Sequence, residues 1–331
     1  MYFCYFCGVM DYLSTILKPI EGEMEEFKRR YSLIFTSADA QIDALLKFLL
    51  TRKGKCMRPI LVLLVAKTFG SVNDSIYHLA SSVELLHQGS LIHDDVVDES
   101  DLRRGKPSVN SAFDNKMAVL LGDFIVSQAL QQVASSHIEC VKEISRLIGT
   151  LSEGEIIQIG ALDSPLLSED VYFDIISRKT AYLFSISARL SALLSGASKA
   201  EIDAFEQFAY KSGLCFQIMD DILDYHSQSE TGKASGNDLK EGKFTLPSIY
   251  ALNHSDRDWS AEIKSIRSLT ASAEVISKVT DYSISNGGIE YAMAKMRSLK
   301  AEALAALPSG LSELLQNAFA AFLDLITDRI R

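Results

Sequence analysis

The chain has 331 residues, of which 47% are hydrophobic and 23% are charged, and its formal net charge is −10 at pH 7. Such an acidic chain lacks the basic face that binding to nucleic-acid phosphates requires, so we expect no nucleic-acid partner. The hydrophobic content allows a sizeable buried core and no Pro/Gly/Ser-rich linker divides the chain, so we expect a single domain over residues 1–331.

The chain opens with an apolar stretch, MYFCYFCGVM. This stretch has no positively charged leading region and is too short for a signal peptide or a membrane span. We expect translation to start at Met10, and residues 1–9 to be a non-native or disordered extension. The five cysteines, at positions 4, 7, 56, 140 and 215, are odd in number, which predicts no disulfide framework and favours a cytoplasmic location. Cys4 and Cys7 have no second Cys pair or His to complete a zinc site.

Long segments beyond this point carry apolar residues at the three- and four-residue spacing of helices. Two such runs consist of Ile76, Leu79, Val83, Leu86 and Ser90, and of Phe205, Phe208, Ala209, Leu214 and Ile218. Breaks between periodic segments are expected at Gly70, Gly105 to Pro107, Gly149, Pro165, Gly196, Gly232 to Gly236, Pro247 and Pro308. Strand-like alternation is nearly absent, so the sequence predicts an all-α fold of ten or more helices.

The pattern Asp-Asp-x-x-Asp occurs twice, each time at the end of an apolar helical segment. The first copy begins at Asp94 in LIHDDVVDESDLRRGKP, and the second begins at Asp220 in FQIMDDILDY. Residues four apart share a helix face, so Asp94 lies with Asp98 and Asp220 lies with Asp224. Like charges at this spacing repel each other, so such a helix is expected to bind cations. Carboxylates without Cys or His favour a hard cation such as Mg²⁺, which also binds phosphate oxygens.

Basic residues near both motifs could hold a second diphosphate without a metal. They lie in three predicted loops and are Lys55, Arg58, Arg103, Arg104, Lys233 and Lys243. Arg suits bidentate phosphate contact and Lys adds a compact charge. The alternative interpretation is that each acidic motif is a solvated helix end and each basic residue a surface charge. Two acidic motifs with basic loops beside both favour a metal and diphosphate site.

Seven segments resemble those of the trans-polyprenyl diphosphate synthases, in the order of that family. They are GKCMRP, ELLHQGSLIHDDVVDESDLRRGKPS, LGDFIVSQA, EGEIIQ, RKTAYLF, FQIMDDILDY and GKASGNDLKEGKFTLP. The resemblance implies an isoprenoid synthase-like helical bundle around a central catalytic cavity. It also implies a Mg²⁺-dependent transferase that condenses isopentenyl diphosphate with an allylic diphosphate, with three ions per active site once substrate is bound. Two departures, Ser108 in place of Thr and Cys56 in the first basic loop, remove no functional group.

The resemblance implies a role for each motif residue. Magnesium would be held by Asp94, Asp98, Asp220 and Asp224, which with Lys179 would carry catalysis. Isopentenyl diphosphate would be held by Lys55, Arg58, His87 and Arg104. The allylic partner would be contacted by Arg103, Lys179, Thr180, Gln217, Lys233 and Lys243. Positive charge would stabilise the departing diphosphate, the isopentenyl double bond would attack the carbocation, and the released diphosphate would accept the proton.

Two of these assignments are also consistent with position in the sequence. His87 precedes Asp94 by two helical turns and so could face the same cavity, although a hydrogen-bonded core histidine is the alternative. Lys179 and Thr180 lie in an otherwise apolar helix, where a Lys needs a charged partner such as a diphosphate.

The residues one turn before the first motif bear on product length. Gly89 and Ser90 are small, whereas Phe or Tyr would block a growing chain, and the next turn, at Leu86, adds ~5.4 Å of depth. Bulk at these positions accompanies short products in the family, so we expect about thirty to fifty carbons, with octaprenyl diphosphate the specific expectation and a quinone side chain its use. The alternative is that Gly89 and Ser90 only permit close helix packing.

Other functions remain open on the sequence: a farnesyl or geranylgeranyl diphosphate synthase, a class I terpene cyclase, or a non-catalytic partner subunit. Cyclases lack GKxxRP and the second Asp motif, and non-catalytic subunits tend to lose a motif that this chain keeps. The resemblance further implies a homodimer. We expect no transmembrane segment, and only peripheral membrane contact during product release.

Overall fold

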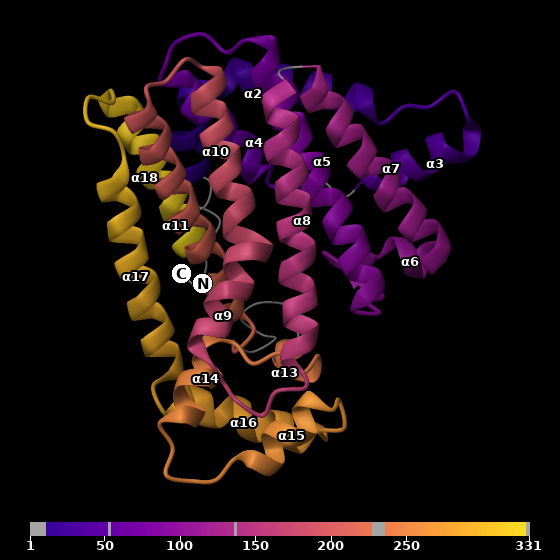
Figure 1. Ribbon diagram of the computed structural model, residues 1–331, viewed down its shortest axis with the longest axis vertical. Coiled ribbons are helices and arrows are strands. Elements are labelled where there is room, and N and C mark those ends of the chain that lie inside the picture. The colour runs from indigo at the N-terminus through magenta and orange to yellow at the C-terminus, as the bar shows by residue number, and fades with distance from the viewer. Residues whose placement is uncertain (1–10, 52–53, 136–137, 227–235, 329–331) are drawn as a thin grey trace.

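The computed structural model describes residues 11–51, 54–135, 138–226 and 236–328. Residues 1–9, with Cys4 and Cys7, and the predicted ligand Lys233 lie outside the described residues. The described part is all-α as predicted, with more than ten helices and one short hairpin (Figure 1).

The elements of the first half are η1 (Lys18–Ile20), α2 (Glu21–Ile34), α3 (Ala40–Leu50), α4 (Met57–Lys67), α5 (Asp74–Val97), β1 (Leu102–Arg103), β2 (Lys106–Pro107), α6 (Val109–Ala112), α7 (Asn115–Ala134) and α8 (Ile138–Ala161). Those of the second half are α9 (Glu169–Ile176), the π-helix η2 (Ser177–Ala181), α10 (Tyr182–Leu194), α11 (Lys199–Leu223), α13 (Asn237–Lys240), α14 (Leu246–Asn253), α15 (Ser260–Arg267), α16 (Ala273–Ser285), α17 (Gly288–Ala306) and α18 (Glu313–Thr327).

The two helices that carry the acidic motifs form where the apolar period predicts them. In α5 the Asn73 side chain caps the first turn by accepting from the backbone N–H of Ile76. In α11 Ser198 and Glu201 form a reciprocal capping box. The apolar residues of both runs are buried, so each helix turns its hydrophobic face to one shared core that extends from Ile16 to Ile326.

Two glycines let α5 and α7 approach each other closely. A Cβ added to Gly89 would lie 2.9 Å from Cγ2 of Val126, and one added to Gly122 would lie 2.1 Å from Nε2 of His93. No side chain larger than hydrogen fits at either position unless the neighbouring Val126 or His93 side chain moves. Gly89 is therefore a packing residue between the two helices.

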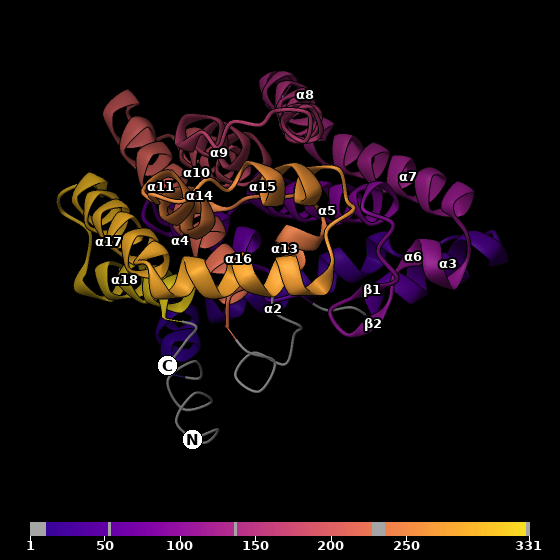
Figure 2. The ribbon, with the colours of Figure 1, turned by 90° about the horizontal axis from the view of Figure 1, so that it is seen from below.

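The long helices α8, α10, α11 and α17 run along the long axis of the molecule, and α14, α15 and α16 lie together at its lower end (Figure 1). Seen from below, α13 lies between α5 and α16 (Figure 2). Gly236, at the start of α13, packs against Ile276 and Thr280 of α16. The short helix α13 therefore fills the space beneath the ends of the motif-bearing helices.

Three local predictions were wrong. Gly149 lies inside α8 rather than in a break, because a single exposed Gly destabilises a long helix only slightly. Arg58 belongs to the first turn of α4 rather than to a loop. The segment with Arg103 and Arg104 forms a two-stranded hairpin, in which Leu102 pairs with Pro107.

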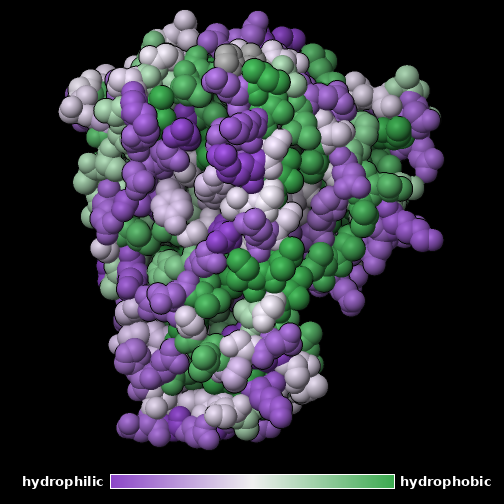
Figure 3. All heavy atoms as spheres, viewed as in Figure 1, coloured by the Kyte–Doolittle hydropathy of each residue, from purple (hydrophilic) through white to green (hydrophobic). Residues whose placement is uncertain are grey.

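One described helix, α7, is long and apolar enough to cross a membrane by length and composition alone. It packs against α5 through Gly122, and the core helix of a soluble protein passes the same test. Its outer face exposes Val119 and Leu120, and α8 exposes Ile156 and Ile159. Hydrophobic side chains gather in a band across this side of the molecule (Figure 3).

Candidate active site

The first acidic motif lies where α5 ends. Asp94 is in its last turn and Asp98 is its C-cap residue. Asp95 is buried and accepts a hydrogen bond from Nε of Arg103 at 2.7 Å. Arg103, predicted to contact the allylic diphosphate, is thus paired with Asp95 in this structure. Asp94 and Asp98 are the two carboxylates of the motif that take no part in this pairing.

The second motif divides in the same way at the end of α11. Asp221 is buried, and its two oxygens accept from the Tyr172 hydroxyl at 2.6 Å and from Nε2 of Gln217 at 2.9 Å. Burial raises the pKa of Asp221 to about 7, against the lowering effect of these two hydrogen bonds. Asp220 is exposed instead. The middle carboxylate of each motif therefore anchors protein structure.

Lys243 joins the two motifs. Its Nζ lies 3.0 Å from Oδ1 of Asp98, and its backbone N–H donates to the carbonyl oxygen of Asp238 at 2.8 Å. The backbone N–H of Asp238 in turn donates to Oδ2 of Asp224 at 3.0 Å. The ends of α5 and α11 are thus connected across one short loop, so both motifs border the same site.

Asp94 lies within the electrostatic reach of Lys179. Burial raises the pKa of Asp94 to about 6; Lys179 lowers it, and Glu155 and Asp98 raise it further. Lys179 forms an ion pair with Glu155 on α8. The charged partner that the apolar helix required is therefore a carboxylate of the protein in this structure.

The π-helix η2 carries Lys179 and Thr180. It lies between α8 and α11 at two glycines: a Cβ on Gly154 would lie 2.9 Å from Cγ of Lys179, and one on Gly213 would lie 2.5 Å from Cα of Ala181. π-Helical turns are rare and often occur at functional sites. The Thr180 hydroxyl donates to Oε1 of Gln217 at 2.8 Å, so these two predicted ligands contact each other.

Arg58, His87 and Arg104 form a second, cationic group. Arg58 is 6% exposed, and its guanidinium lies 4.8 Å from the ring centroid of Phe184. Burial lowers the pKa of Arg58 to about 10, although Glu84 opposes this change. Burial, with the charges of Arg58 and Arg104, holds the pKa of His87 well below its usual range. His87 is therefore a neutral imidazole in a positively charged environment.

The loop that leads into α4 completes this group. Gly54 packs on Arg104, because a Cβ there would lie 2.6 Å from the guanidinium nitrogen Nη1. Lys55 is exposed, and Cys56 has a left-handed backbone with φ of 50°. The carboxylate of Asp220 raises the pKa of Arg58. The cationic group therefore lies within electrostatic reach of the second acidic motif.

The donor set fits a hard divalent cation that completes its coordination from a ligand. Among the described residues, no three His, Cys, Asp or Glu side chains converge closely enough to hold a metal on their own. The outer carboxylates instead lie in two separate pairs, which suits ions that take their remaining ligands from phosphate oxygens and water.

Two acidic residues of this site were not singled out by the sequence analysis. Asp238 has a pKa well above its usual value because of burial and of the nearby Asp221 and Asp224. Glu155 pairs with Lys179. Glu155 lies in the segment EGEIIQ and Asp238 in GNDLKEGK, and both segments belong to the family resemblance. Their place in these segments is the feature of the sequence that could have identified them.

The small residues before the first motif have different surroundings. Gly89 faces α7, which supports the helix-packing interpretation for that residue. Ser90 is partly exposed, donates to the carbonyl of His87 at 3.0 Å and precedes Asp94 by one turn. Leu86 is 2% exposed. Of these two small residues, Gly89 is buried against α7 and Ser90 is partly exposed one turn before Asp94.

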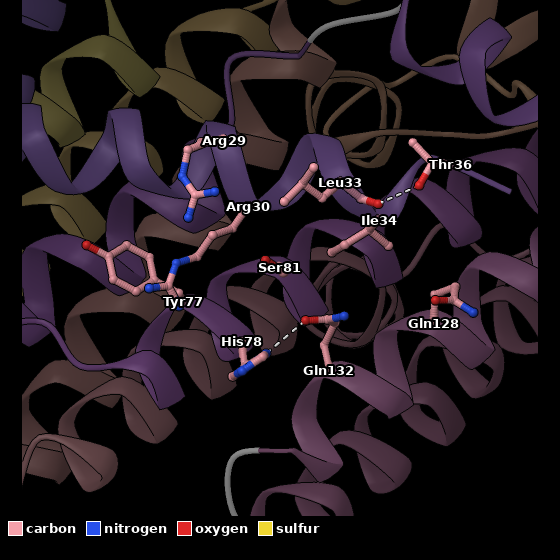
Figure 4. A pocket seen from close by; sticks show the side chains of 10 residues that line it. All are labelled: Arg29, Arg30, Leu33, Ile34, Thr36, Tyr77, His78, Ser81, Gln128 and Gln132. Atoms are coloured by element: carbon pink, nitrogen blue, oxygen red, sulfur yellow. Dashed lines mark hydrogen bonds between the residues drawn. The ribbon is translucent and has the colours of Figure 1, made fainter.

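A cavity of about 500 Å³ lies elsewhere, between α2, α5 and α7 (Figure 4). Its lining residues are Arg29, Arg30, Leu33, Ile34, Thr36, Tyr77, His78, Ser81, Gln128 and Gln132. Ser81 is about 20 Å along α5 from Asp94, at the helical rise per residue. The arginines are paired, Arg29 with Glu26 and Arg30 with Glu26 and Asp74. We assign the chemistry to the motifs rather than to this cavity.

Comparisons with known proteins indicate the family and the fold of the chain. The family model described as polyprenyl synthetase matches residues 39–283. Octaprenyl diphosphate synthase of Escherichia coli (strain K12) is 33% identical over 274 residues, which cover 82% of this chain and 85% of that protein. The crystal structure of polyprenyl synthase from Caulobacter crescentus CB15, complexed with calcium and isoprenyl diphosphate, superposes with a TM-score of 0.89 at 29% identity over 96% of this chain and 98% of that one. Geranylgeranyl pyrophosphate synthase from Bacteroides thetaiotaomicron superposes with a TM-score of 0.83 at 37% identity over 96% of this chain and 99% of that one.

Proposed function

Since the chain belongs to the polyprenyl synthetase family and is a prenyltransferase, we propose that it condenses isopentenyl diphosphate with an allylic diphosphate in a Mg²⁺-dependent reaction. The product is an all-trans polyprenyl diphosphate of about thirty to fifty carbons, by the depth that each helical turn adds. The observation that carries the proposal is the link from Asp98 through Lys243 and Asp238 to Asp224, which supports two acidic motifs acting on one substrate.

The acidic side of the site takes the allylic diphosphate. Asp94, Asp98, Asp220 and Asp224 hold Mg²⁺ together with diphosphate oxygens, and we expect three ions when substrate is bound. Magnesium supplies charge neutralisation for the departing diphosphate. Lys179, Thr180, Gln217 and Lys243 contact the same diphosphate, and we extend this role to Arg103 and to Lys233.

The cationic group takes isopentenyl diphosphate. Arg58 and Arg104 bind its phosphates with Lys55, because guanidinium groups bind phosphate in a bidentate manner. A neutral His87 can donate one hydrogen bond without adding charge. The isopentenyl double bond then attacks the allylic carbon as its bond to oxygen breaks, and the released diphosphate accepts the proton that is lost.

The acidic motifs and the cationic group together suit two diphosphates, which favours a synthase over a class I terpene cyclase, since a cyclase needs only one. The positive charges of Arg58 and Arg104 beside a neutral His87 suit a second diphosphate, which a cyclase does not bind. The chain also keeps every motif that a non-catalytic partner subunit tends to lose.

Octaprenyl diphosphate is our specific expectation for the product, with a quinone side chain as its use. The similarity to octaprenyl diphosphate synthase over most of both chains supports this length. A shorter product is the second candidate, because the Bacteroides thetaiotaomicron geranylgeranyl pyrophosphate synthase is similar along nearly the whole chain.

We further propose that the chain is one synthase domain that works as a cytoplasmic homodimer. The exposed apolar side chains Val119 and Leu120 on α7 and Ile156 and Ile159 on α8 offer a face for a second copy or for membrane contact during product release. Among the residues that the structure describes, Cys56, Cys140 and Cys215 form no disulfide, which suits a reducing compartment.

The test is to incubate the purified protein with Mg²⁺, labelled isopentenyl diphosphate and farnesyl or geranylgeranyl diphosphate, and to size the products. We expect label in a product of about forty carbons, the octaprenyl length, with none after chelation of the metal. Failure to incorporate label with either primer would refute the proposed activity.

A further inference from the structure

A buried chain of hydrogen bonds runs from α9 to the π-helix and involves four side chains. The Tyr172 hydroxyl donates to Oδ2 of Asp221 at 2.6 Å, and Nε2 of Gln217 donates to Oδ1 of Asp221 at 2.9 Å. The Thr180 hydroxyl donates to Oε1 of Gln217 at 2.8 Å. Tyr172 and Asp221 are each 5% exposed and Thr180 is 7% exposed, so water competes little for these bonds.

The direction of every bond in this chain follows from Asp221. Both oxygens of Asp221 accept hydrogen bonds in this arrangement, as those of an ionised carboxylate do. Gln217 therefore turns its NH₂ group to Asp221, and its carbonyl oxygen must face Thr180. The Thr180 hydroxyl then has to donate to Gln217, which leaves the oxygen lone pairs of Thr180 for other partners. These hydrogen bonds thus fix both the orientation of the Gln217 amide and the position of the hydroxyl proton of Thr180.

We propose that Tyr172 is a positioning residue for the allylic diphosphate, a role that rests on the proposed function. Tyr172 holds Asp221, and through it the Gln217 amide and the Thr180 hydroxyl beside Lys179. Asp221 stands between Asp220 and Asp224 of the second motif, the two residues that the proposed function assigns to the metal. Without the phenol, one buried oxygen of Asp221 loses its donor, and the carboxylate is free to turn toward the metal-binding side.

The structure separates this role from mere anchoring of α9. Tyr291 also donates its phenol to a carboxylate, Oε2 of Glu169, at 2.7 Å. Glu169 is the first residue of α9, the helix that carries Tyr172. Tyr291 therefore anchors the same helix but is not one of the four residues of the hydrogen-bond chain. Tyr291→Phe therefore removes a matched phenol–carboxylate bond from the same helix and serves as the control.

The experiment measures KM for each substrate separately in the full-length protein. Tyr172→Phe should raise KM for the allylic diphosphate roughly 5- to 30-fold, the effect of one lost buried hydrogen bond. KM for isopentenyl diphosphate should stay within about twofold of the wild-type value, because Arg58 and Arg104 are not among the four residues of this hydrogen-bond chain. Tyr291→Phe should leave both values as in the wild type.

Two further variants protect the test. Asp221→Asn keeps both neighbours but replaces one acceptor oxygen by a donor, so it should give the same KM pattern if Tyr172→Phe fails to fold. Tyr172→Phe combined with Asp221→Asn should cost little more than either change alone, since both break one chain. Losses that simply add, equal rises in both KM values, or a Tyr291→Phe protein that behaves like Tyr172→Phe would overturn the positioning role. If the wild-type protein elongates no chain, the proposed function fails, and this role fails with it.

Discussion

The ammonium group of Lys243 lies 3.0 Å from the carboxylate of Asp98, although the two residues are 145 positions apart in the sequence. Burial disfavours the charged form of Lys243, but Asp98 and Glu241 outweigh it and raise the pKa of the ammonium above its usual value. A permanent positive charge thus lies between the first motif and the loop that follows the second.

Lys243→Met should weaken the site on the allylic side. Removing the ammonium leaves Asp98 without its cation and removes one positive charge from the site that binds the diphosphate. We therefore expect kcat/KM for the allylic substrate to fall roughly 10- to 100-fold. The dependence of the rate on Mg²⁺ concentration should also change, because a metal no longer competes with an ammonium for Asp98. Lys240→Met, on the neighbouring exposed position, is the control. Equal kinetics of both variants would contradict this role.

Asp94→Asn should stabilise the metal-free protein while abolishing activity. Burial raises the pKa of Asp94 from 3.8 to about 6, so the folded protein binds a proton that the unfolded chain has already lost. Stability is therefore lost as pH rises from about 4 to about 6, by up to about 3 kcal/mol. Asn carries no charge, so the variant does not lose stability in this pH range.

The measurement is urea unfolding of both proteins in chelator. Asp94→Asn should exceed the wild type above about pH 6, and the two should converge near about pH 4. Asp170→Asn, at an exposed position of α9, should show no such pH-dependent gain. A constant difference at all pH values would show that the raised pKa is not the cause.

Ser90→Phe should shorten the product. Ser90 precedes Asp94 by one helical turn, so a phenyl ring there would meet the growing chain within about 5.4 Å of the first motif. We expect products of about twenty carbons or fewer, sized after removal of the diphosphate. Ser298→Phe, on the exposed face of α17, should keep the wild-type product. An unchanged product from Ser90→Phe would place the elongation path elsewhere.

Gly213→Ala should destabilise the protein and disturb the π-helix. The added Cβ would lie 2.5 Å from Cα of Ala181, and backbone cannot move away as a side chain can. We expect a loss of about 1–3 kcal/mol in the free energy of unfolding, typical of overpacking. Gly149→Ala, within α8 and with nothing within 4 Å of its Cβ position, is the matched control and should be neutral or slightly stabilising. Equal effects of the two changes would argue against close packing at Gly213.

The helical period predicted the framework well. The runs Ile76 to Ser90 and Phe205 to Ile218 are α5 and α11, because an apolar face repeated over several turns is buried in any all-α arrangement. Gly149 misled the prediction because intrinsic propensity is a weak signal within a long packed helix. The π-helix at Ser177 to Ala181 has no local signature and depends on contacts with glycines of two other helices.

Motif spacing predicted the members of the candidate site but not how they pair with one another. Motif spacing pointed to Asp94, Asp98, Asp220 and Asp224. It could not reveal that Asp221 is engaged by Tyr172, since that contact joins different helices. Nor could it distinguish Gly89 from Ser90, because the position of α7 decides which of two adjacent small residues is covered.

A crystal structure with Mg²⁺ and a non-ionisable thio analogue of farnesyl diphosphate would test most directly whether both motifs act on one leaving group. We predict metal ions about 2.0–2.1 Å from carboxylate oxygens of both Asp94 and Asp220, all bound to the same diphosphate. Metal and diphosphate at one motif alone, with the other motif's carboxylates pointing to solvent, would contradict the account.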